Sequence, residues 1–214
     1  MRCVLPHIPN PFDFLDSILE LNSDSRVLIE FQRREFIIGK NMWTQISHDH
    51  VNIFSIGDFA ERFEILDSGE FANSEWAYVL LKKGTTINSN VDCFSEFIEF
   101  EKVFRVRDFE IESLAELKSP IAIYGAAGKG IVFGFSLMNS KFAGGGIVAI
   151  DSDINRHNRF MECSGIKVIS PTEALNFLAQ NTTIVLMNSS HYDYVSKIFA
   201  GKFKILTIGN IDLQ

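Results

Sequence analysis

The chain has 214 residues, of which 46% are hydrophobic and 22% charged, and its formal net charge is −7. This composition is ordinary for a soluble globular protein, and the length allows one large domain or two small ones with real cores. The acidic balance excludes a broad surface for nucleic-acid phosphates, so nucleic acid is not an expected partner.

Cysteine usage and hydropathy predict where the protein resides. The three cysteines are widely spaced and odd in number, so they predict neither a disulfide framework nor a paired zinc motif. Prolines interrupt the first residues, where a signal peptide would need an apolar core, and no apolar run is long enough to cross a bilayer. We therefore expect a cytoplasmic protein with no membrane partner.

The first part of the chain predicts a strand end and loop over 1–9, followed by a helix over 11–21. Asn10 can cap this helix, and Pro11 suits its first position. The continuous apolar run at 26–31 is typical of a strand buried in a parallel sheet.

A second group of signals predicts a helix that starts at Ser55, with Asp58 in its first turn. Strands are expected at about 63–67 and 76–82, joined by a short polar loop. Two such strands late in a domain indicate an antiparallel hairpin at the edge of a sheet. Residues 1–85 are therefore interpreted as one α/β segment.

Residues 86–118 are polar and then charged, with a helical pattern of apolar positions. These positions are Phe94, Phe97, Ile98, Phe100 and Phe104. Packing against neighbouring elements is their expected role, rather than contact with a ligand. The segment is interpreted as a bridging helix or helix pair.

From residue 119 onward, short apolar strands alternate with helices. Strands are predicted at 121–124, 147–150, 167–169, 183–187 and 204–208, and helices at 131–139, from Ser170 onward and at 191–199. Repeated strand–helix–strand units indicate a parallel sheet with right-handed crossovers. The predicted fold class is α/β, with a Rossmann-like domain over 119–214.

A glycine-rich turn joins the first strand and helix of this domain. Gly125, Gly128 and Gly130 stand where a parallel sheet presents backbone N–H groups to a phosphate. Lys129 could add a positive charge, and Asp151 follows the next strand, where an acid can bind a ribose hydroxyl.

Two further interpretations of this turn stay open. Ala127 replaces the glycine that lets a pyrophosphate approach closely, so small residues could serve only the packing of strand against helix. A small NAD-type or acyl-carrier-type Rossmann domain is a further alternative. It would leave residues 1–118 unexplained, and the residues after 119 leave no room for the substrate domain of a dehydrogenase.

The segment around Ser47, Asp49 and His50 concentrates titratable groups. In an extended segment, His48 and His50 would share one side and could both ligate a metal, but no third ligand is evident, so no metal site is expected. Alternatively, His50 acts as a general base, with Asp49 positioning a substrate. The histidines could also simply satisfy backbone groups in a loop.

Six short segments along the chain follow one another in a recognisable order. They lie at 4–15, 27–30, 46–55, 124–130, 150–155 and 165–171. In this order and spacing, the chain resembles the sugar C-methyltransferase family over almost its whole length. The early segments are similar to the second half of that family's methyltransferase domain, and the later ones to its C-terminal domain.

The resemblance implies transfer of a methyl group from S-adenosylmethionine to a carbon of a nucleotide-linked keto sugar. It implies that His50 is the base that removes a proton beside the ketone. Asp49 stands where the family has Glu, and Ser47 where it has Tyr, which alters the hydrogen bonds available to the sugar.

The resemblance further implies that the C-terminal domain cradles the nucleotide-linked sugar. The residues that match are Gly125, Gly128, Lys129, Gly130 and Asp151.

The family's S-adenosylmethionine-binding half has no counterpart in these residues. We therefore expect no cofactor bound by this chain alone, and S-adenosylmethionine only if the missing half is supplied. Residues 1–85 would be a partial methyltransferase-like segment with an open sheet edge and exposed apolar faces. A complementing methyltransferase half or a homodimer are the expected partners. The alternative from another class is a non-catalytic module that binds or scaffolds nucleotide-linked sugars.

Overall fold

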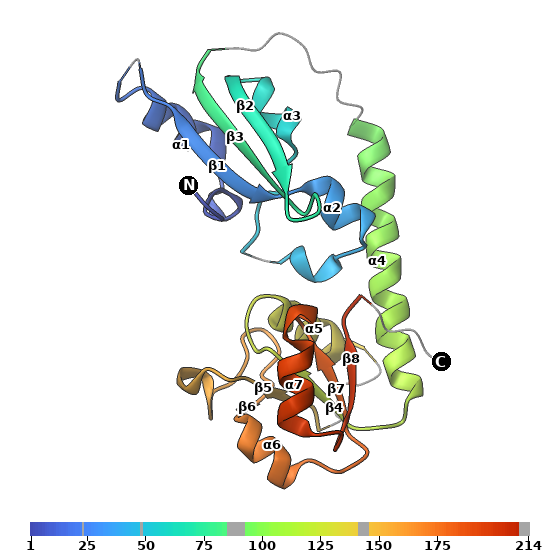
Figure 1. Cartoon of the computed structure of the whole chain (residues 1–214). Helices are drawn as coiled ribbons and strands as arrows, with labels where there is room; N and C mark the ends of the chain where they lie inside the picture. Colours follow the sequence, from blue (N-terminus) through green and yellow to red (C-terminus); the bar gives the residue numbers. More distant parts are fainter. Residues whose placement is uncertain (23, 48, 85–92, 141–145, 210–214) are drawn as a thin grey trace. The chain divides into compact units, whose positions relative to one another are not determined.

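A computed structural model describes residues 1–22, 24–47, 49–84, 93–140 and 146–209, with the side chains of 93–99 outside the description (Figure 1). The chain divides into two compact units, Met1–Phe104 and Arg105–Gln214. We refer to them as unit 1 and unit 2. The boundary falls inside the long helix α4, Cys93–Glu116, which occupies most of the predicted bridging segment 86–118.

Unit 1 contains a three-stranded sheet and several short helices. Before α4, its elements are η1 (Leu5–His7), α1 (Pro11–Leu19), β1 (Val27–Gln32), α2 (Arg34–Gly39), η2 (Trp43–Gln45), α3 (Ile56–Ala60), β2 (Phe63–Phe71) and β3 (Trp76–Lys83). The predicted helices at 11–21 and from Ser55 are confirmed, and at the start of the second the Ser55 N–H donates to Asp58 Oδ2 at 2.8 Å. The short helix α2 was not predicted.

The antiparallel hairpin at the edge of a sheet is confirmed, because β2 pairs antiparallel with β3 and lies at one edge. The strand order is β1-β3-β2, so β3 is central and β1 forms the other edge. The prediction that 26–31 is a strand buried in a parallel sheet is wrong, because β1 pairs antiparallel with β3 along its whole length. A single parallel bridge, between Arg2 and Glu30, joins β1 to the start of the chain.

The side chains of β1 explain this correction. Val27, Ile29 and Phe31 are buried on one face, whereas Leu28 on the other face is 47% exposed. A strand covered on both faces would bury both sets. The continuous apolar run therefore reflects one core-facing row plus an exposed leucine.

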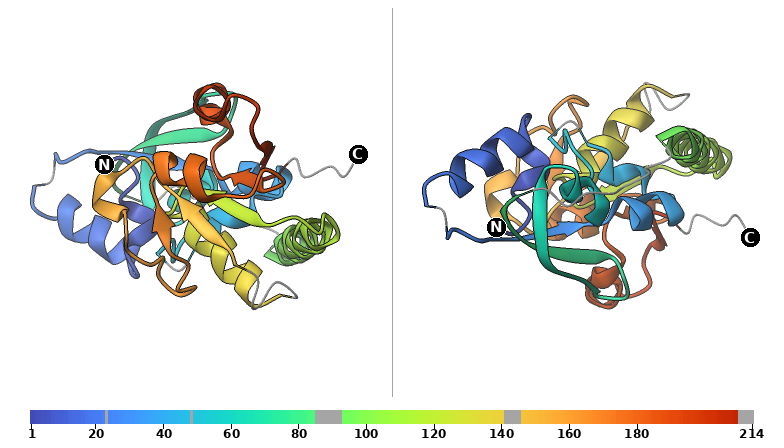
Figure 2. Two further views of the ribbon diagram at one scale, coloured as in Figure 1. Left: turned by 90° about the horizontal axis from the view of Figure 1, so that it is seen from below. Right: turned by 90° about the horizontal axis from the view of Figure 1, so that it is seen from above.

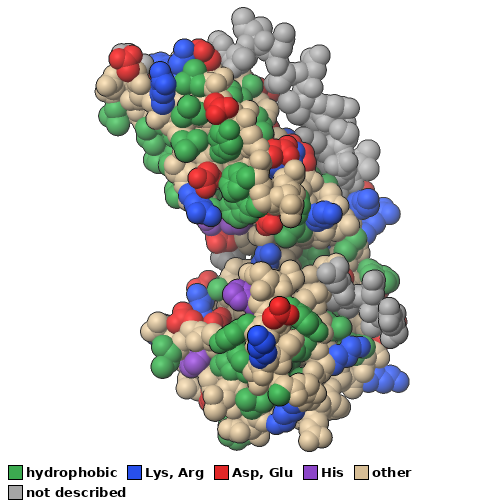
Figure 3. Space-filling view, viewed as in Figure 1, with side chains coloured by type: hydrophobic (Ala, Val, Ile, Leu, Met, Phe, Trp, Pro, Cys, Tyr) green, Lys and Arg blue, Asp and Glu red, His purple; other side chains and the backbone are tan. Residues whose placement is uncertain are grey.

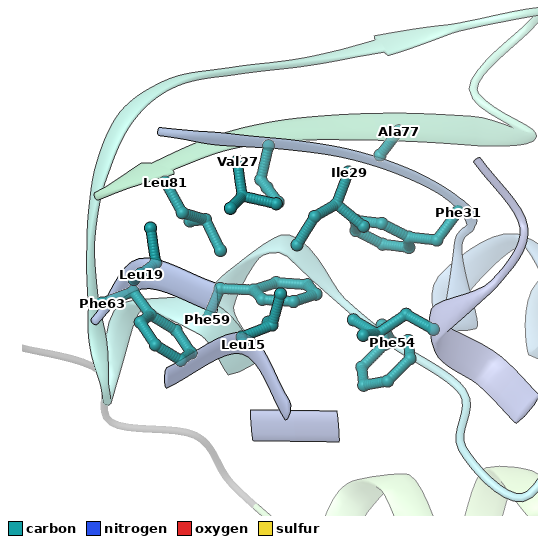
Figure 4. Close-up of a cluster of buried hydrophobic side chains, with 12 residues drawn as sticks. Leu15, Leu19, Val27, Ile29, Phe31, Phe54, Phe59, Phe63, Ala77 and Leu81 are labelled. Carbon is teal, nitrogen blue, oxygen red and sulfur yellow. The ribbon is translucent and has the colours of Figure 1, made fainter. Parts of the chain in front are cut away.

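The core of unit 1 lies between the sheet and helices α1 and α3 (Figure 4). Aromatic rings dominate it. Phe59 is fully buried, and its ring centroid lies 5.3 to 5.8 Å from those of Phe12, Phe31 and Phe54. Rings packed at such distances stabilise a core beyond the area that they bury.

On the opposite face of this sheet, apolar and charged side chains alternate (Figure 3). Leu28 is exposed there beside half-buried Leu80 and Tyr78, its neighbours across and along the sheet. Lys82 forms an ion pair with Glu64 on the same face.

Unit 2 is a parallel α/β structure. After α4, its elements are β4 (Ile121–Tyr124), α5 (Lys129–Met138), β5 (Val148–Ile150), η3 (Ile154–Arg156), β6 (Val168–Ile169), α6 (Pro171–Phe177), β7 (Thr183–Leu186), η4 (Ser189–His191), α7 (Tyr192–Phe199) and β8 (Lys204–Thr207). The sheet order is β6-β5-β4-β7-β8, with every pair parallel. The predicted α/β class and the parallel sheet are confirmed, and the strand order is consistent with a Rossmann-like fold.

The strand order explains how helices cover the sheet. The chain moves one way from β4 to β5 and β6, and the other way from β7 to β8. Because crossovers are right-handed, the helices of these two directions cover opposite faces. Figure 2 shows α5 and α7 on opposite sides of the sheet. The order reverses between β4 and β7, and at such a point open α/β sheets bind ligands.

Among the residues that the structure describes, no helix combines the length and apolar character that crossing a membrane requires.

Candidate functional site

A cavity of about 640 Å³ opens at the carboxyl ends of the central strands of unit 2. Its wall is formed by residues that follow β4, β5 and β7, the three strands around the reversal of strand order. Its lining is Tyr124, Gly125, Ala127, Lys129, Asp151, Ser152, Leu186, Met187, Asn188, His191 and Tyr194. This size and mixture of apolar wall and convergent polar groups are typical of small-molecule sites.

The structure brings three of the five predicted nucleotide-sugar residues to this cavity, namely Gly125, Lys129 and Asp151. Gly128 and Gly130 do not line it. Gly128 has φ +45° and is the N-cap of α5, a conformation that favours glycine.

Gly130 has a packing role. A Cβ atom at this position would lie 1.8 Å from the backbone oxygen of Gly125. No side chain fits there, so the first turn of α5 can close on the end of β4 only with glycine. Close packing of strand and helix therefore accounts for Gly130.

Asp151 holds the glycine-rich turn in place. Its Oδ2 accepts a hydrogen bond from the Ala126 N–H at 2.8 Å, and its Oδ1 accepts one from the Asp153 N–H at 2.9 Å. Each carboxylate oxygen has a second lone-pair direction. The carboxylate can therefore hold the turn and still accept a ligand hydroxyl.

The turn also presents backbone donors. Within the described part of the chain, the N–H groups of Ala127 and Gly128 have no hydrogen-bond acceptor. They stand at the N-terminal end of α5, where the helix dipole favours negative charge. Lys129 adds a cationic side chain to the same wall.

Several lining residues were missed by sequence reasoning. Asn188 and His191 follow β7, and Tyr194 lies on the first turns of α7. Their only signal in the sequence was that they follow a predicted strand. Residues that follow β7 lie close to those that follow β4 if these two strands are neighbours in the sheet. The sequence did not reveal that they are.

Tyr124 and Ser152 both line the cavity. Their hydroxyls are hydrogen-bonded at 2.8 Å. Burial raises the pKa of the Tyr124 phenol, against a smaller lowering by the Ser152 hydrogen bond. The phenol is therefore neutral at physiological pH and offers a hydrogen-bonding group rather than a charge.

A second cluster lies in unit 1, on the loop after η2. The Ser47 hydroxyl donates to Asp49 Oδ1 at 2.5 Å, and His50 Nδ1 lies 3.1 Å from the backbone oxygen of Gln45. The three predicted catalytic residues Ser47, Asp49 and His50 therefore share one loop. His48 lies outside the described residues.

His7 joins this cluster from a distant part of the sequence. Its ring packs edge-on against that of His50, with centroids 4.9 Å apart, and its Nδ1 lies 2.9 Å from the backbone oxygen of Asp49. Sequence reasoning did not single out His7. Asn52 ties the two segments together, since its Nδ2 donates to the Ile8 oxygen at 2.7 Å.

These hydrogen bonds fix the tautomers of both imidazoles. A carbonyl oxygen only accepts, so Nδ1 of His7 and of His50 must each carry the proton. The Nε2 atom of each neutral ring then holds a lone pair. Such a nitrogen can take up a proton or bind a metal ion.

The cavity of unit 2 and the histidine cluster of unit 1 are thus the two candidate sites, and each is assembled from segments that are separate in the sequence. Comparison with protein-family models yields no match, and comparison with curated proteins yields no similar sequence.

Proposed function

We propose that unit 2 binds a nucleotide-linked sugar in the cavity at the carboxyl ends of β4, β5 and β7. The observation that carries the proposal is the position of this cavity, where the strand order reverses and the glycine-rich turn meets residues that follow β7. Parallel sheets use this position for nucleotide ligands because backbone N–H groups and the N-terminus of a helix converge there.

Each part of such a ligand has a matching group in the wall. The diphosphate would accept a hydrogen bond from the N–H group of Ala127 and pair with Lys129. A ribose hydroxyl would donate to Asp151. Asn188 and His191, which also line the cavity, would then contact the sugar.

Calorimetric titration of the full chain with UDP-glucose and dTDP-glucose tests the proposal. We expect saturable binding of at least one, weakened about 10-fold in Asn188→Ala or Lys129→Met, because each removes one polar or charge-assisted contact. Lys204→Met, an exposed change on β8, serves as the matched control. Binding that the two cavity variants leave unchanged would place the ligand elsewhere, and no binding of any nucleotide or nucleotide-linked sugar would refute the proposal.

A second candidate function is methylation of that sugar, in line with the resemblance to sugar C-methyltransferases. The tautomer of His50 favours it, since an unprotonated Nε2 is what a general base needs. In this proposal, the groups that hold S-adenosylmethionine are supplied by a complementing polypeptide with which this chain assembles.

Two measurements separate the candidates. Titration with S-adenosylmethionine is expected to show no tight binding by these residues alone. Tight binding would contradict the proposal that the S-adenosylmethionine-binding groups lie outside this chain. With a complementing half present, His50→Asn should abolish methyl transfer and leave binding of the nucleotide-linked sugar unchanged. If the sugar binds but His50→Asn changes nothing, unit 2 is a binding module only.

A further inference from the structure

The cluster of His7, Asp49 and His50 has the chemistry of a metal site. One ligand atom from each of the three side chains lies within 4.8 Å of the other two. Two imidazoles and a carboxylate form a donor set that suits zinc and similar divalent transition ions. All three side chains are at least partly accessible, so an ion can enter from solvent.

The surroundings orient these groups as metal ligands are usually oriented. Histidines that bind metals commonly donate their other ring N–H to a backbone carbonyl or a carboxylate, which fixes the ring and makes the ligating nitrogen more basic. His7 does so to the backbone oxygen of Asp49, and His50 to that of Gln45. Both rings therefore offer Nε2.

The carboxylate is positioned in a similar way. The Ser47 hydroxyl donates to Asp49 Oδ1, while Oδ2 lies 3.8 Å from His7 Nδ1. Ligand atoms around a tetrahedral zinc ion lie roughly 3.3 Å apart, given Zn–N distances of about 2.0 Å. The three side chains offer ligand atoms within 4.8 Å of one another, so binding an ion would draw these groups closer together.

We propose that His7, Asp49 and His50 bind one divalent transition-metal ion of the zinc type, with solvent at the fourth position. The site lies in unit 1 and does not depend on the proposed nucleotide-sugar cavity of unit 2. An ion on His50 Nε2 would prevent that atom from accepting a proton. Metal binding and the base role of His50 are therefore mutually exclusive at any one moment.

Variants can remove each ligand while keeping the loop intact. Asn places an amide nitrogen near the position of histidine Nδ1, so His7→Asn and His50→Asn retain the donor to the backbone carbonyl and lose Nε2. Asp49→Asn retains an acceptor for Ser47 and removes the negative charge. His157→Gln in unit 2 is the control. Near-ultraviolet circular dichroism confirms that each variant keeps its fold.

The experiment is titration of the chelator-treated full chain with Zn²⁺ by calorimetry, and with Co²⁺ by its visible absorption. We expect one ion per chain and a loss of affinity of about 100-fold or more in each of the three ligand variants, but not in the control. Mg²⁺, which prefers oxygen ligands, should not compete.

Three outcomes would overturn the assignment. They are unchanged zinc affinity in the ligand variants, equal affinity for Mg²⁺, and loss of zinc in His48→Asn with retention in His7→Asn. The last would mean that the two histidines close in the sequence are the ligands.

Discussion

The imidazole of His7 lies edge-on against that of His50, with 4.9 Å between ring centroids, although the two residues belong to separate segments of unit 1. Backbone and side-chain hydrogen bonds hold these segments together. The Asn52 N–H donates to the Pro6 oxygen at 3.2 Å, and the Asn52 side chain donates to the Ile8 oxygen. Asn52 therefore holds His7 in position without being one of the residues proposed to bind the metal.

Asn52→Ala should loosen this placement. The substitution leaves the Ile8 oxygen without its side-chain donor and should lower the free energy of unfolding by about 1 kcal/mol. It should also weaken zinc binding about 10-fold, the usual effect of losing a group that orients ligands. Urea unfolding and zinc titration measure the two effects, with Asn139→Ala, which removes a hydrogen bond within an exposed helix end, as control. A stability loss without any change in zinc affinity would deny Asn52 a positioning role.

Phe59→Ala should destabilise unit 1 strongly. The ring is fully buried against Phe12, Phe31 and Phe54, so its removal leaves a cavity that costs about 3–5 kcal/mol. Leu21→Ala removes a side chain that is 83% exposed and should change stability by less than about 0.5 kcal/mol. Denaturant unfolding of both variants tests the difference. Similar stabilities would show that this aromatic cluster is not the core of the unit.

Gly130→Ala should destabilise unit 2. The new Cβ would overlap the Gly125 oxygen, a backbone atom that cannot rotate away, so we expect a loss of about 3 kcal/mol or more. Gly146→Ala adds a Cβ with no atom within 4 Å and should be nearly neutral, within about 0.5 kcal/mol. Thermal unfolding compares them. Equal melting temperatures would mean that α5 can shift without cost.

The capping box of α6 predicts a pH dependence. Hydrogen bonds from the Ser170 backbone N–H, and then from its hydroxyl, lower the pKa of Glu173 below its ordinary value of 4.5. A lowered folded-state pKa means that the charged group stabilises the fold above the ordinary value. This contribution is lost as the pH falls through the lower, folded-state pKa.

Urea unfolding between pH 7 and pH 3 checks this dependence. The stability of the original chain should exceed that of Glu173→Gln near neutral pH, and the difference should shrink in acid. Parallel curves for the two proteins would show that the charge of Glu173 contributes nothing.

Local chemistry in the sequence was sufficient to predict most elements. Ser170 and Glu173 cap α6 as expected, because a capping box depends on residues only three positions apart. The alternation of short apolar runs with helices predicted the parallel sheet of unit 2, because repeated strand–helix–strand units place successive strands parallel.

The prediction for β1 was wrong because the apolar run of a strand buried on one face can resemble that of a strand buried on both faces. Leu28 completes an apolar run in β1, yet its side chain remains on the exposed face, and the strand pairs antiparallel. The helix α2 was missed because its six residues are too few to display a helical period.

By itself, the sequence determined the α/β class, the glycine-rich turn between β4 and α5, and the loop that carries Ser47, Asp49 and His50. Only the tertiary structure decided that His7 joins that loop, and that Asn188 and His191 line one cavity together with Asp151. The physical reason is that caps, turns and periodic apolar faces arise from neighbours in the chain. Contacts between distant segments depend instead on strand order and on hydrogen bonds such as that of Asn52, and these leave no periodic signal in the sequence.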